Sequence, residues 1–484
     1  MAGLGIGLLL AARGGSALSR PAFDPPSRTA TGRAPPGATV TVLLDGASAG
    51  SVSASAEGRW TFAFATAPAA GQRIAARAEV TSASLRVAAA EAGATGGDTV
   101  RRLAGFGGDQ GNRIRPSDGT KTTFNVRKRF YTLVPIPNPE VAYTGFHYNS
   151  GAEYDYPNEA TYHSAIELPD GTIRDMGAPV TVMPGTILAK SGKATGFTVP
   201  AGVFWIRTYG RVPSGGRWYY TDAFRSANVG HMEEGVDLVD KAVSGSIGNA
   251  SQQMPASAIG LIGDLPAAHR LFALAGDSLS QGVGGYSHGT APGLALGILA
   301  GLVLESRAGS VLHLGRAGAS AQANRTSYAR RIALMQALSA TDILCDLGVN
   351  DMSSSSSATV LKGHLTTLFT AFKAALPAVR IYQSTITPST TATAPVTDSN
   401  QIVPAAMQDG RRLAFNADLR AGGFGPLVTA VVEFALPAQQ GGDPHLWKSG
   451  YASDAGSPGA QQHPNLTGGE AIVVSAAAQN VLAL

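Results

Sequence analysis

The C-terminal half of the chain alternates short apolar runs with segments of helical periodicity. The apolar runs lie at residues 270–275, 310–314, 342–347, 379–385 and 431–436. The segments with helical spacing lie at residues 323–338, 358–375, 403–419 and 466–482. Strands that alternate with helices predict a parallel, doubly wound sheet. We therefore predict a three-layer α/β sandwich with a flavodoxin-like parallel sheet over residues 265–484.

Near the N-terminus the pattern has the shorter period of β-strands. Residues 40–44 are apolar and run into an Asp-Gly pair, which is a hairpin signal. In residues 58–64 polar and aromatic positions alternate, so that three aromatic rings share one face. Closely spaced short strands of this kind predict a small β-sandwich over residues 28–95, acting as a spacer or as a ligand-binding module.

Residues 100–245 are rich in aromatic side chains. Nine of the 13 tyrosines lie between Tyr131 and Tyr220, among strand-like runs that turn signals separate. This pattern predicts a β-sandwich or jelly roll whose core the rings fill. As an alternative, exposed rings among polar residues, such as Tyr154 and Tyr156, would stack on the C–H faces of sugars.

The composition changes this picture little. The 484 residues include 37 basic and 33 acidic ones, a net charge of +4, and their 14% charged content is well below the roughly 25% usual in soluble proteins. Disordered and coiled-coil chains need more charge or a heptad repeat, so both are excluded. We find no dense Lys/Arg run that indicates nucleic-acid binding and no apolar stretch long enough to span a bilayer.

Cysteine and histidine usage indicates neither disulfides nor metal. The single cysteine, Cys345, lies in an apolar run and is expected in the core. The histidines lack metal-ligand spacing, and no Walker or Rossmann glycine pattern opens a helix, so we expect no metal and no cofactor. Residues 1–27 form a tail or a weak signal-like segment, because no Lys or Arg precedes their apolar part. We expect an extracellular, surface or virion-associated protein, with a cytoplasmic one as the alternative.

Polar residues follow three of the predicted strands. Ser278 comes directly after the first strand, Gly318 after the second and Asn350 after the third. In such sheets the carboxyl ends of the strands carry the ligand site. A serine hydroxyl needs a base to become a nucleophile, and His463, just before the last helical segment, is the candidate. Acyl transfer also needs oxyanion donors, which a glycine N–H and an asparagine amide supply.

These clusters resemble the SGNH (GDSL) hydrolase superfamily. Its four blocks occur in order as Gly276-Asp277-Ser278-Leu279, Gly315-x-x-Gly318, Gly348-x-Asn350-Asp351 and His463-Pro464-Asn465. The resemblance is confined to residues 265–484, less than half of the chain. It implies Ser278 as nucleophile, His463 as general base and then acid, and an oxyanion hole of the Ser278 and Gly318 N–H groups and the Asn350 side chain. Residues 28–95 in turn resemble bacterial Ig-like modules.

One position departs from the pattern of the family. An Asp usually stands three residues before the catalytic His, and here that residue is Ala460. Three possibilities stay open: Asp454 returns to His463 across a looped insertion, Asp443 supplies the carboxylate, or a backbone carbonyl orients the imidazole and the site is a Ser–His dyad.

The sequence therefore predicts a serine esterase that works through an acyl-enzyme. Two accessory β-modules favour a polymer, and we expect the O-deacetylation of a polysaccharide. The expected partner is thus an acylated carbohydrate polymer or a small acyl ester, and lipid or short-chain acyl esters are the alternative substrates. A hypothesis from another class is a surface or virion adhesion protein that binds glycan through a weak or inactive hydrolase domain.

Overall fold

A computed structural model describes most of the chain, which divides into two units, residues 1–95 and 96–484. The described residues are 22–24, 29–33, 39–44, 47–55, 59–66, 74–79, 98–107, 115–149, 151–222, 230–250, 253–281, 297–354, 356–391, 399–404, 410–452, 463–479 and 481–482. Asp454 and Ala460 therefore lie outside the described residues.

The first unit is built of short antiparallel strands. One sheet has the order β1 (Ala22–Asp24), β2 (Thr29–Arg33), β5 (Arg59–Ala63), and the other the order β4 (Ala47–Ser53), β3 (Thr39–Leu44), β6 (Ile74–Glu79). Trp60 and Phe64 are buried together with Val40 and Val42, while Phe62 packs partly buried against them. The region is thus β-rich as predicted, and the Ig-like topology stays a prediction.

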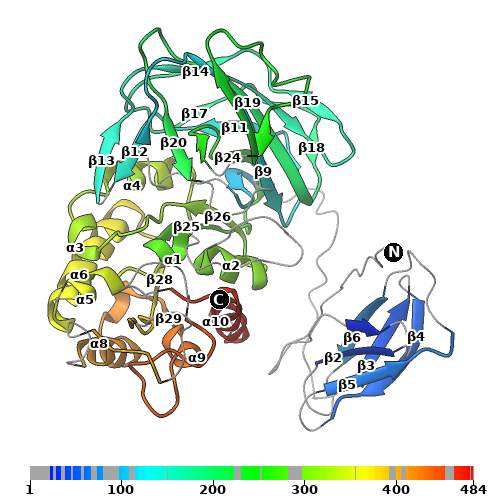
Figure 1. Ribbon diagram of the computed structural model, residues 1–484, viewed down its shortest axis with the longest axis vertical. Coiled ribbons are helices and arrows are strands. Elements are labelled where there is room, and N and C mark those ends of the chain that lie inside the picture. The colour runs from blue at the N-terminus through cyan, green and yellow to red at the C-terminus, as the bar shows by residue number, and fades with distance from the viewer. Residues whose placement is uncertain are drawn as a thin grey trace. The chain divides into compact units, whose positions relative to one another are not determined.

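The second unit begins with a region of antiparallel sheets, residues 99–266, which we call the β-domain (Figure 1). The larger sheet has the order β15 (Ile173–Asp175), β14 (Ala160–Glu167), β19 (Gly202–Arg211), β9 (Thr123–Thr132), β21 (Gly230–Gly235), β22 (Asn249–Ala250), and β16 (Val180–Val182) pairs with β14. A second sheet has the order β17 (Ala189–Lys190), β11 (Glu140–Tyr143), β24 (Gly260–Pro266), β7 (Thr99–Ala104). The β-rich region thus extends past residue 245.

Smaller antiparallel elements complete the β-domain. They are the hairpin of β12 (Phe146–Asn149) and β13 (Ala152–Asp155), the pair of β10 (Ile136–Pro137) and β18 (Thr198–Val199), and the sheet of β23 (Gln253–Pro255), β20 (Tyr219–Asp222) and β8 (Arg115–Pro116). The sandwich or jelly-roll topology stays a prediction.

Most of the aromatic rings of the β-domain fill cores. Tyr143 and Tyr162 stack on each other with ring centroids 5.0 Å apart, and both are buried. Phe146 and Tyr148 are buried as well. The hypothesis of sugar stacking by exposed rings extends along the whole run of rings at residues 143–162, and for these four members of the run it is wrong, because they are buried. Tyr154 is the exception, with 49% of its surface exposed.

Residues 271–482 form the α/β domain, whose sheet is parallel. Its order is β26 (Ser310–His313), β25 (Leu271–Ala275), β27 (Asp342–Cys345), β28 (Arg380–Ser384), β29 (Ala430–Val432). All five predicted strands are present, and the order 2-1-3-4-5 is that of flavodoxin-like sheets. The predicted parallel α/β fold is therefore confirmed.

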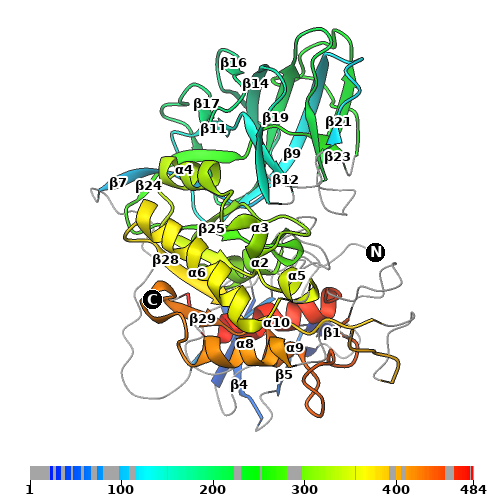
Figure 2. The ribbon, with the colours of Figure 1, turned by 90° about the vertical axis from the view of Figure 1, so that its left-hand side faces the viewer.

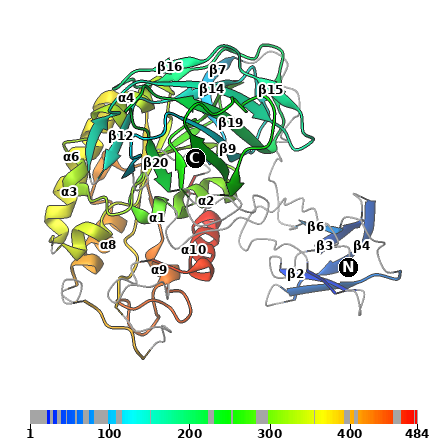
Figure 3. The ribbon, with the colours of Figure 1, turned by 45° about the horizontal axis from the view of Figure 1, so that its top comes forward.

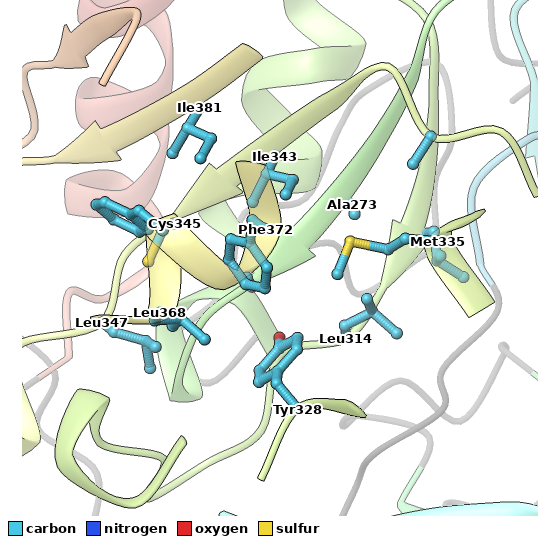
Figure 4. Close-up of a cluster of buried hydrophobic side chains, with 14 of the residues drawn as sticks. Ala273, Leu314, Tyr328, Met335, Ile343, Cys345, Leu347, Leu368, Phe372 and Ile381 are labelled. Carbon is cyan, nitrogen blue, oxygen red and sulfur yellow. The ribbon is translucent and has the colours of Figure 1, made fainter. Parts of the chain in front are cut away.

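Helices cover both faces of this sheet, as Figure 2 shows. One face packs against α2 (Ile298–Glu305), α9 (Ala435–Ala438) and α10 (Leu466–Ala478). The other packs against α3 (Ala321–Asn324), α4 (Ala329–Ala337), α6 (Ala358–Ala375) and α8 (Arg411–Arg420). Successive residues of a strand serve opposite layers, since Ala273 belongs to one cluster and Phe272 to the other. Cys345 lies fully buried in the cluster of Ala273, on the face covered by α3, α4, α6 and α8, as predicted (Figure 4).

One predicted helix, residues 323–338, is split into α3 and α4, and the prediction of a single helix is wrong. Each N-terminus finds its own carboxylate from a distant part of the chain. Asp351 accepts the N–H groups of Ala321 and Gln322 at 2.8 and 2.9 Å. Glu153 of the β-domain accepts those of Arg330 and Arg331 at 2.8 and 3.1 Å. Satisfied N-termini stabilise both starts, so the chain breaks between them.

The β12–β13 hairpin joins the two domains through a buried charge. Glu153 forms an ion pair with Arg331 at 2.9 Å, and the two side chains are only 8% and 2% exposed. The Arg331 guanidinium also lies over the rings of Tyr328 and Tyr148, 3.5 and 4.5 Å from their centroids. Tyr148 belongs to the same buried cluster as the α/β core. The two domains therefore share one core.

Removal of the Glu153 carboxylate is expected to destabilise this unit strongly. Glu153→Ala leaves the Arg331 charge buried without its partner, which costs about 3–5 kcal/mol. Urea unfolding of the full chain measures the change. Lys362→Gln is the control, because it breaks the exposed pair with Asp418 and is expected to cost about 1 kcal/mol or less. Equal losses in the two variants would contradict the prediction.

Candidate active site

Ser278 follows strand β25, an inner strand of the parallel sheet, and opens the short helix α1 (Ser278–Gln281). The Asp277 side chain accepts the N–H of Leu279 at 3.0 Å and so fixes the turn. Gly276 must lack a side chain, because a Cβ there would overlap the Asp346 carboxylate and come within 2.5 Å of the Ser280 hydroxyl. The turn therefore holds Ser278 at the carboxyl end of the sheet.

His463 lies against this serine. Its Nε2 atom is 2.7 Å from the Ser278 Oγ, a hydrogen bond between residues 185 positions apart in the chain. The loop that carries the imidazole is fixed by Asn465, which caps α10 by accepting the N–H of Gly468 at 2.9 Å. The Asn465 amide also donates to the carbonyl oxygen of Gly450 at 2.6 Å. A histidine within hydrogen-bond reach of a serine hydroxyl has the geometry of a general base and its nucleophile.

Gly318 lies in the loop after β26. Its φ of +77° is a conformation that favours glycine, and no atom lies within 4 Å of the place where a Cβ would stand. The loop is tied to the turn that carries Ser278, since the Arg316 N–H donates to the Gly276 carbonyl at 2.9 Å. The Ala317 N–H donates to the Gln281 side-chain oxygen. Gly318 is thus an exposed residue of a loop that is held beside the serine turn.

Asn350 comes from the start of α5 (Val349–Ser353), which follows β27. Its Nδ2 donates to the Ala319 carbonyl at 2.9 Å and, over a long 3.4 Å, to the Asp277 carboxylate. Hydrogen bonds to the neighbours of Ser278 and Gly318 thus link the three predicted strand-end residues, Ser278, Gly318 and Asn350.

The third member of the proposed triad is not fixed by the described residues. Asp443 caps its own turn, where its carboxylate accepts the N–H of His445 at 2.9 Å. Asp454 lies outside the described residues. The group that orients the His463 imidazole therefore stays a prediction.

Two buried acids, Asp277 and Asp346, lie at the turn that carries Ser278. Asp346 accepts the N–H of Asp277 at 2.9 Å. Burial raises the pKa of Asp346 to about 7. Burial, and then the neighbouring Asp346 charge, raises the pKa of Asp277 well above its usual range. Two neighbouring buried carboxyls resist ionising together, so the Asp277–Asp346 pair holds a proton near neutral pH.

The sequence interpretation missed two polar residues of this site, Gln281 and Asp346. Gln281 is buried and links the turn that carries Ser278 to the Gly318 loop, and its Nε2 has no hydrogen-bond partner among the described residues. Asp346 follows a fully buried strand, and an acid that interrupts an apolar run is a signal that could have found it. Nothing in the local pattern singles out Gln281.

Two further searches concern metal and membrane. In the described part of the chain, no group of three or more His, Cys, Asp or Glu side chains could hold a metal ion. None of its helices is both long and apolar enough to cross a bilayer.

A doubly wound sheet with a Ser–His pair at its carboxyl edge defines a class of serine hydrolases. Residues 274–471 match the GDSL-like Lipase/Acylhydrolase family. The C-terminal part of the chain is therefore a GDSL-like (SGNH) acylhydrolase domain, as the resemblance of its four blocks implied.

A comparison with curated proteins finds no match. Among solved structures, the chain is similar to a family two carbohydrate esterase from Clostridium thermocellum in complex with cellohexaose, at 14% identity over 77% of this chain and 97% of that one, with a TM-score of 0.31. It is similar to a GDSL-like lipase from Bacteroides thetaiotaomicron at 14% identity, over 43% and 86%, with a TM-score of 0.31. A carbohydrate esterase family 3 from Talaromyces cellulolyticus matches at 16% identity, over 42% and 92%, with a TM-score of 0.27.

Loss of the Gln281 amide is expected to slow the reaction without weakening substrate binding. Gln281→Ala removes the acceptor of the Ala317 N–H, so the Gly318 donor loses its place, and small misplacements of this kind cost about 10- to 100-fold in kcat. Steady-state hydrolysis of p-nitrophenyl acetate measures kcat and KM. Gln336→Ala is the control, since its amide donates to the Ala375 carbonyl away from the site. A kcat for Gln281→Ala within twofold of the control would contradict the expectation.

The raised pKa of Asp346 predicts a pH-dependent stability. Between about pH 4 and pH 7 the folded protein keeps a proton that the unfolded chain releases, so this contribution is lost as the pH rises to about 7. Asp346→Asn has no proton to lose. As the pH rises across this range, the free energy of unfolding of Asp346→Asn should therefore increase relative to that of the wild type, by up to about 4 kcal/mol.

Urea unfolding of both proteins at several pH values tests this. A constant offset between them reflects altered contacts, whereas titration of Asp346, together with the Asp277 carboxyl whose pKa its charge raises, makes the offset grow with pH. Asp418→Asn, at an exposed side chain, is the control and should show a flat difference. The same flat difference for Asp346→Asn would refute the titration.

Proposed function

We propose that the chain is a serine esterase that hydrolyses ester bonds through an acyl-enzyme and removes O-acetyl groups from a polysaccharide. The observation that carries the proposal is the 2.7 Å hydrogen bond between the His463 Nε2 and the Ser278 Oγ at the carboxyl edge of the sheet. It supports an active enzyme over an adhesion protein with an inert hydrolase fold, because a pure binding role needs no such pair.

The reaction proceeds in two halves. His463 accepts the proton of the Ser278 hydroxyl as the Oγ attacks the ester carbonyl carbon, and the carbonyl electrons move to oxygen. The N–H groups of Ser278 and Gly318 and the Asn350 amide stabilise this oxyanion. Asn350 is suited to the task because its 3.4 Å contact with Asp277 is weak and can be exchanged for a stronger bond.

Collapse of the tetrahedral intermediate breaks the ester bond. His463 gives its proton to the leaving alcohol oxygen, and the acyl group stays on Ser278. A water molecule then attacks the acyl carbon while His463 takes its proton. The second collapse releases the carboxylic acid and returns the proton to Ser278.

Two features favour a short acyl group on a large alcohol. The apolar helix α2 packs in the core against α10, so its buried side chains offer no surface to a long acyl chain. The β-domain and the α/β domain form one unit, and the β-domain hairpin contacts the Arg316 side chain in the Gly318 loop. A polymer that extends from the serine would meet both domains. Such substrates lie outside cells, in keeping with the extracellular or surface location expected from the sequence.

Loss of the Ser278 hydroxyl tests the esterase directly. Ser278→Ala is expected to lower kcat for p-nitrophenyl acetate by about 10³-fold or more, because no acyl-enzyme can form. Acetate release from acetylated polysaccharides should vanish with it. Ser244→Ala, at an exposed position of the β-domain, is the control and should behave as wild type. Wild-type protein inert toward every ester would refute the proposal.

A further inference from the structure

The β12–β13 hairpin presents two different faces. Its register pairs Tyr148 with Glu153 and His147 with Tyr154. Paired residues share a face and neighbouring pairs alternate. The face of Tyr148 and Glu153 packs on the α/β domain through Arg331. The opposite face carries His147, Tyr154 and Asn149.

An aromatic stack occupies this opposite face. The Tyr154 ring lies on the His147 ring, with centroids 5.5 Å apart and an interplanar angle of 23°. His147 in turn contacts the rings of Tyr156 and Tyr219, at 5.9 and 4.1 Å between centroids. Tyr154 is 49% exposed, whereas His147 beneath it is 6% exposed. Tyr154 is thus a half-exposed ring that stacks on a buried one.

The buried imidazole of this stack, His147, is an uncharged aromatic ring at neutral pH. Burial, and then the charges of Arg316 and Arg330, lowers the pKa of His147 to about 4. Its Nδ1 has no hydrogen-bond partner among the described residues. This neutral ring, packed against Tyr154, serves as its backing.

The same face reaches the candidate active site. Asn149 accepts a hydrogen bond from the guanidinium of Arg316, whose own N–H donates to the Gly276 carbonyl at 2.9 Å. Arg316 stands two residues before Gly318. Because a strand rises about 3.3 Å per residue, His147 and its partner Tyr154 lie about 7 Å along the hairpin from this contact. Figure 1 and Figure 3 show β12 and β20 at the edge of the β-domain on the side of α1.

We propose that Tyr154, backed by His147, Tyr156 and Tyr219, is a sugar-binding subsite that stacks on a pyranose ring of the polymer next to the acylated residue. The inference rests on the proposed esterase function and names the part of the substrate that the β-domain holds. A flat, half-exposed ring held from beneath matches the C–H face of a pyranose, and the exposed Asn149 beside it has a side chain that can hydrogen-bond to hydroxyl groups.

Kinetics on two substrates test the subsite. In the full chain, Tyr154→Ala should raise KM for acetate release from acetylated xylan about tenfold, with kcat little changed. Its kinetics on p-nitrophenyl acetate should stay those of wild type, because this ester has no sugar. Tyr154→Phe keeps the ring and should retain a KM within twofold of wild type. Tyr209→Ala, on β19 of the same domain, is the matched control and should change neither substrate.

A binding measurement separates this inference from the esterase proposal. Affinity gel electrophoresis in acetylated xylan compares Ser278→Ala with Ser278→Ala/Tyr154→Ala, so that no turnover intervenes. Weaker retardation of the double variant supports the subsite even if wild type proves inert as an esterase. Equal retardation, or a KM for Tyr154→Ala within twofold of Tyr209→Ala, overturns it. Wild type that hydrolyses no ester overturns the esterase proposal alone.

Discussion

The site depends on how closely two strand ends, those of β25 and β26, approach the Ser280 hydroxyl. Ser280 donates to the Asp277 carbonyl at 2.9 Å, and Gly276 and Gly315 leave room for it because a Cβ on either would collide with it. This contact brings the turn after β25 against the loop after β26. Ser278 lies two residues before Ser280, Gly318 lies three residues after Gly315, and the Asp346 carboxyl lies against Gly276. The mutual geometry of these three residues therefore follows from a packing constraint.

The sequence predicts those parts whose cause is local. Each strand of the parallel sheet is an apolar run that ends in a polar or glycine residue, and the motif order brings Ser278 and His463 to one edge. The splitting of residues 323–338 into two helices could not be predicted, because Glu153, which caps the second helix, lies 178 residues before Arg331. Tyr148 and Tyr154 likewise have similar polar neighbours, and only their register in the hairpin buries one and exposes the other.

The polar interior of the α/β domain favours function over stability. Asp277 and Asp346 are buried beside each other where ionisation is costly, and the Asp346 Oδ2 has no hydrogen-bond partner among the described residues. The burial of two carboxyls therefore costs stability. The acids instead accept the N–H groups of the nucleophile turn and fix its backbone. Such local instability is typical of sites that must hold a reactive group in one orientation.

The cap that Glu153 places on α4 also bears on the order of folding. The β-domain leaves the ribosome before any strand of the α/β domain, and domains generally fold in that order. A finished β12–β13 hairpin would then present its carboxylate to α4 as that helix emerges, so the first domain acts as an intramolecular template for the second. The hydrolase domain is consequently not a portable module. Recombination that exchanged the β-domain for another would have to supply a new carboxylate for the buried Arg331.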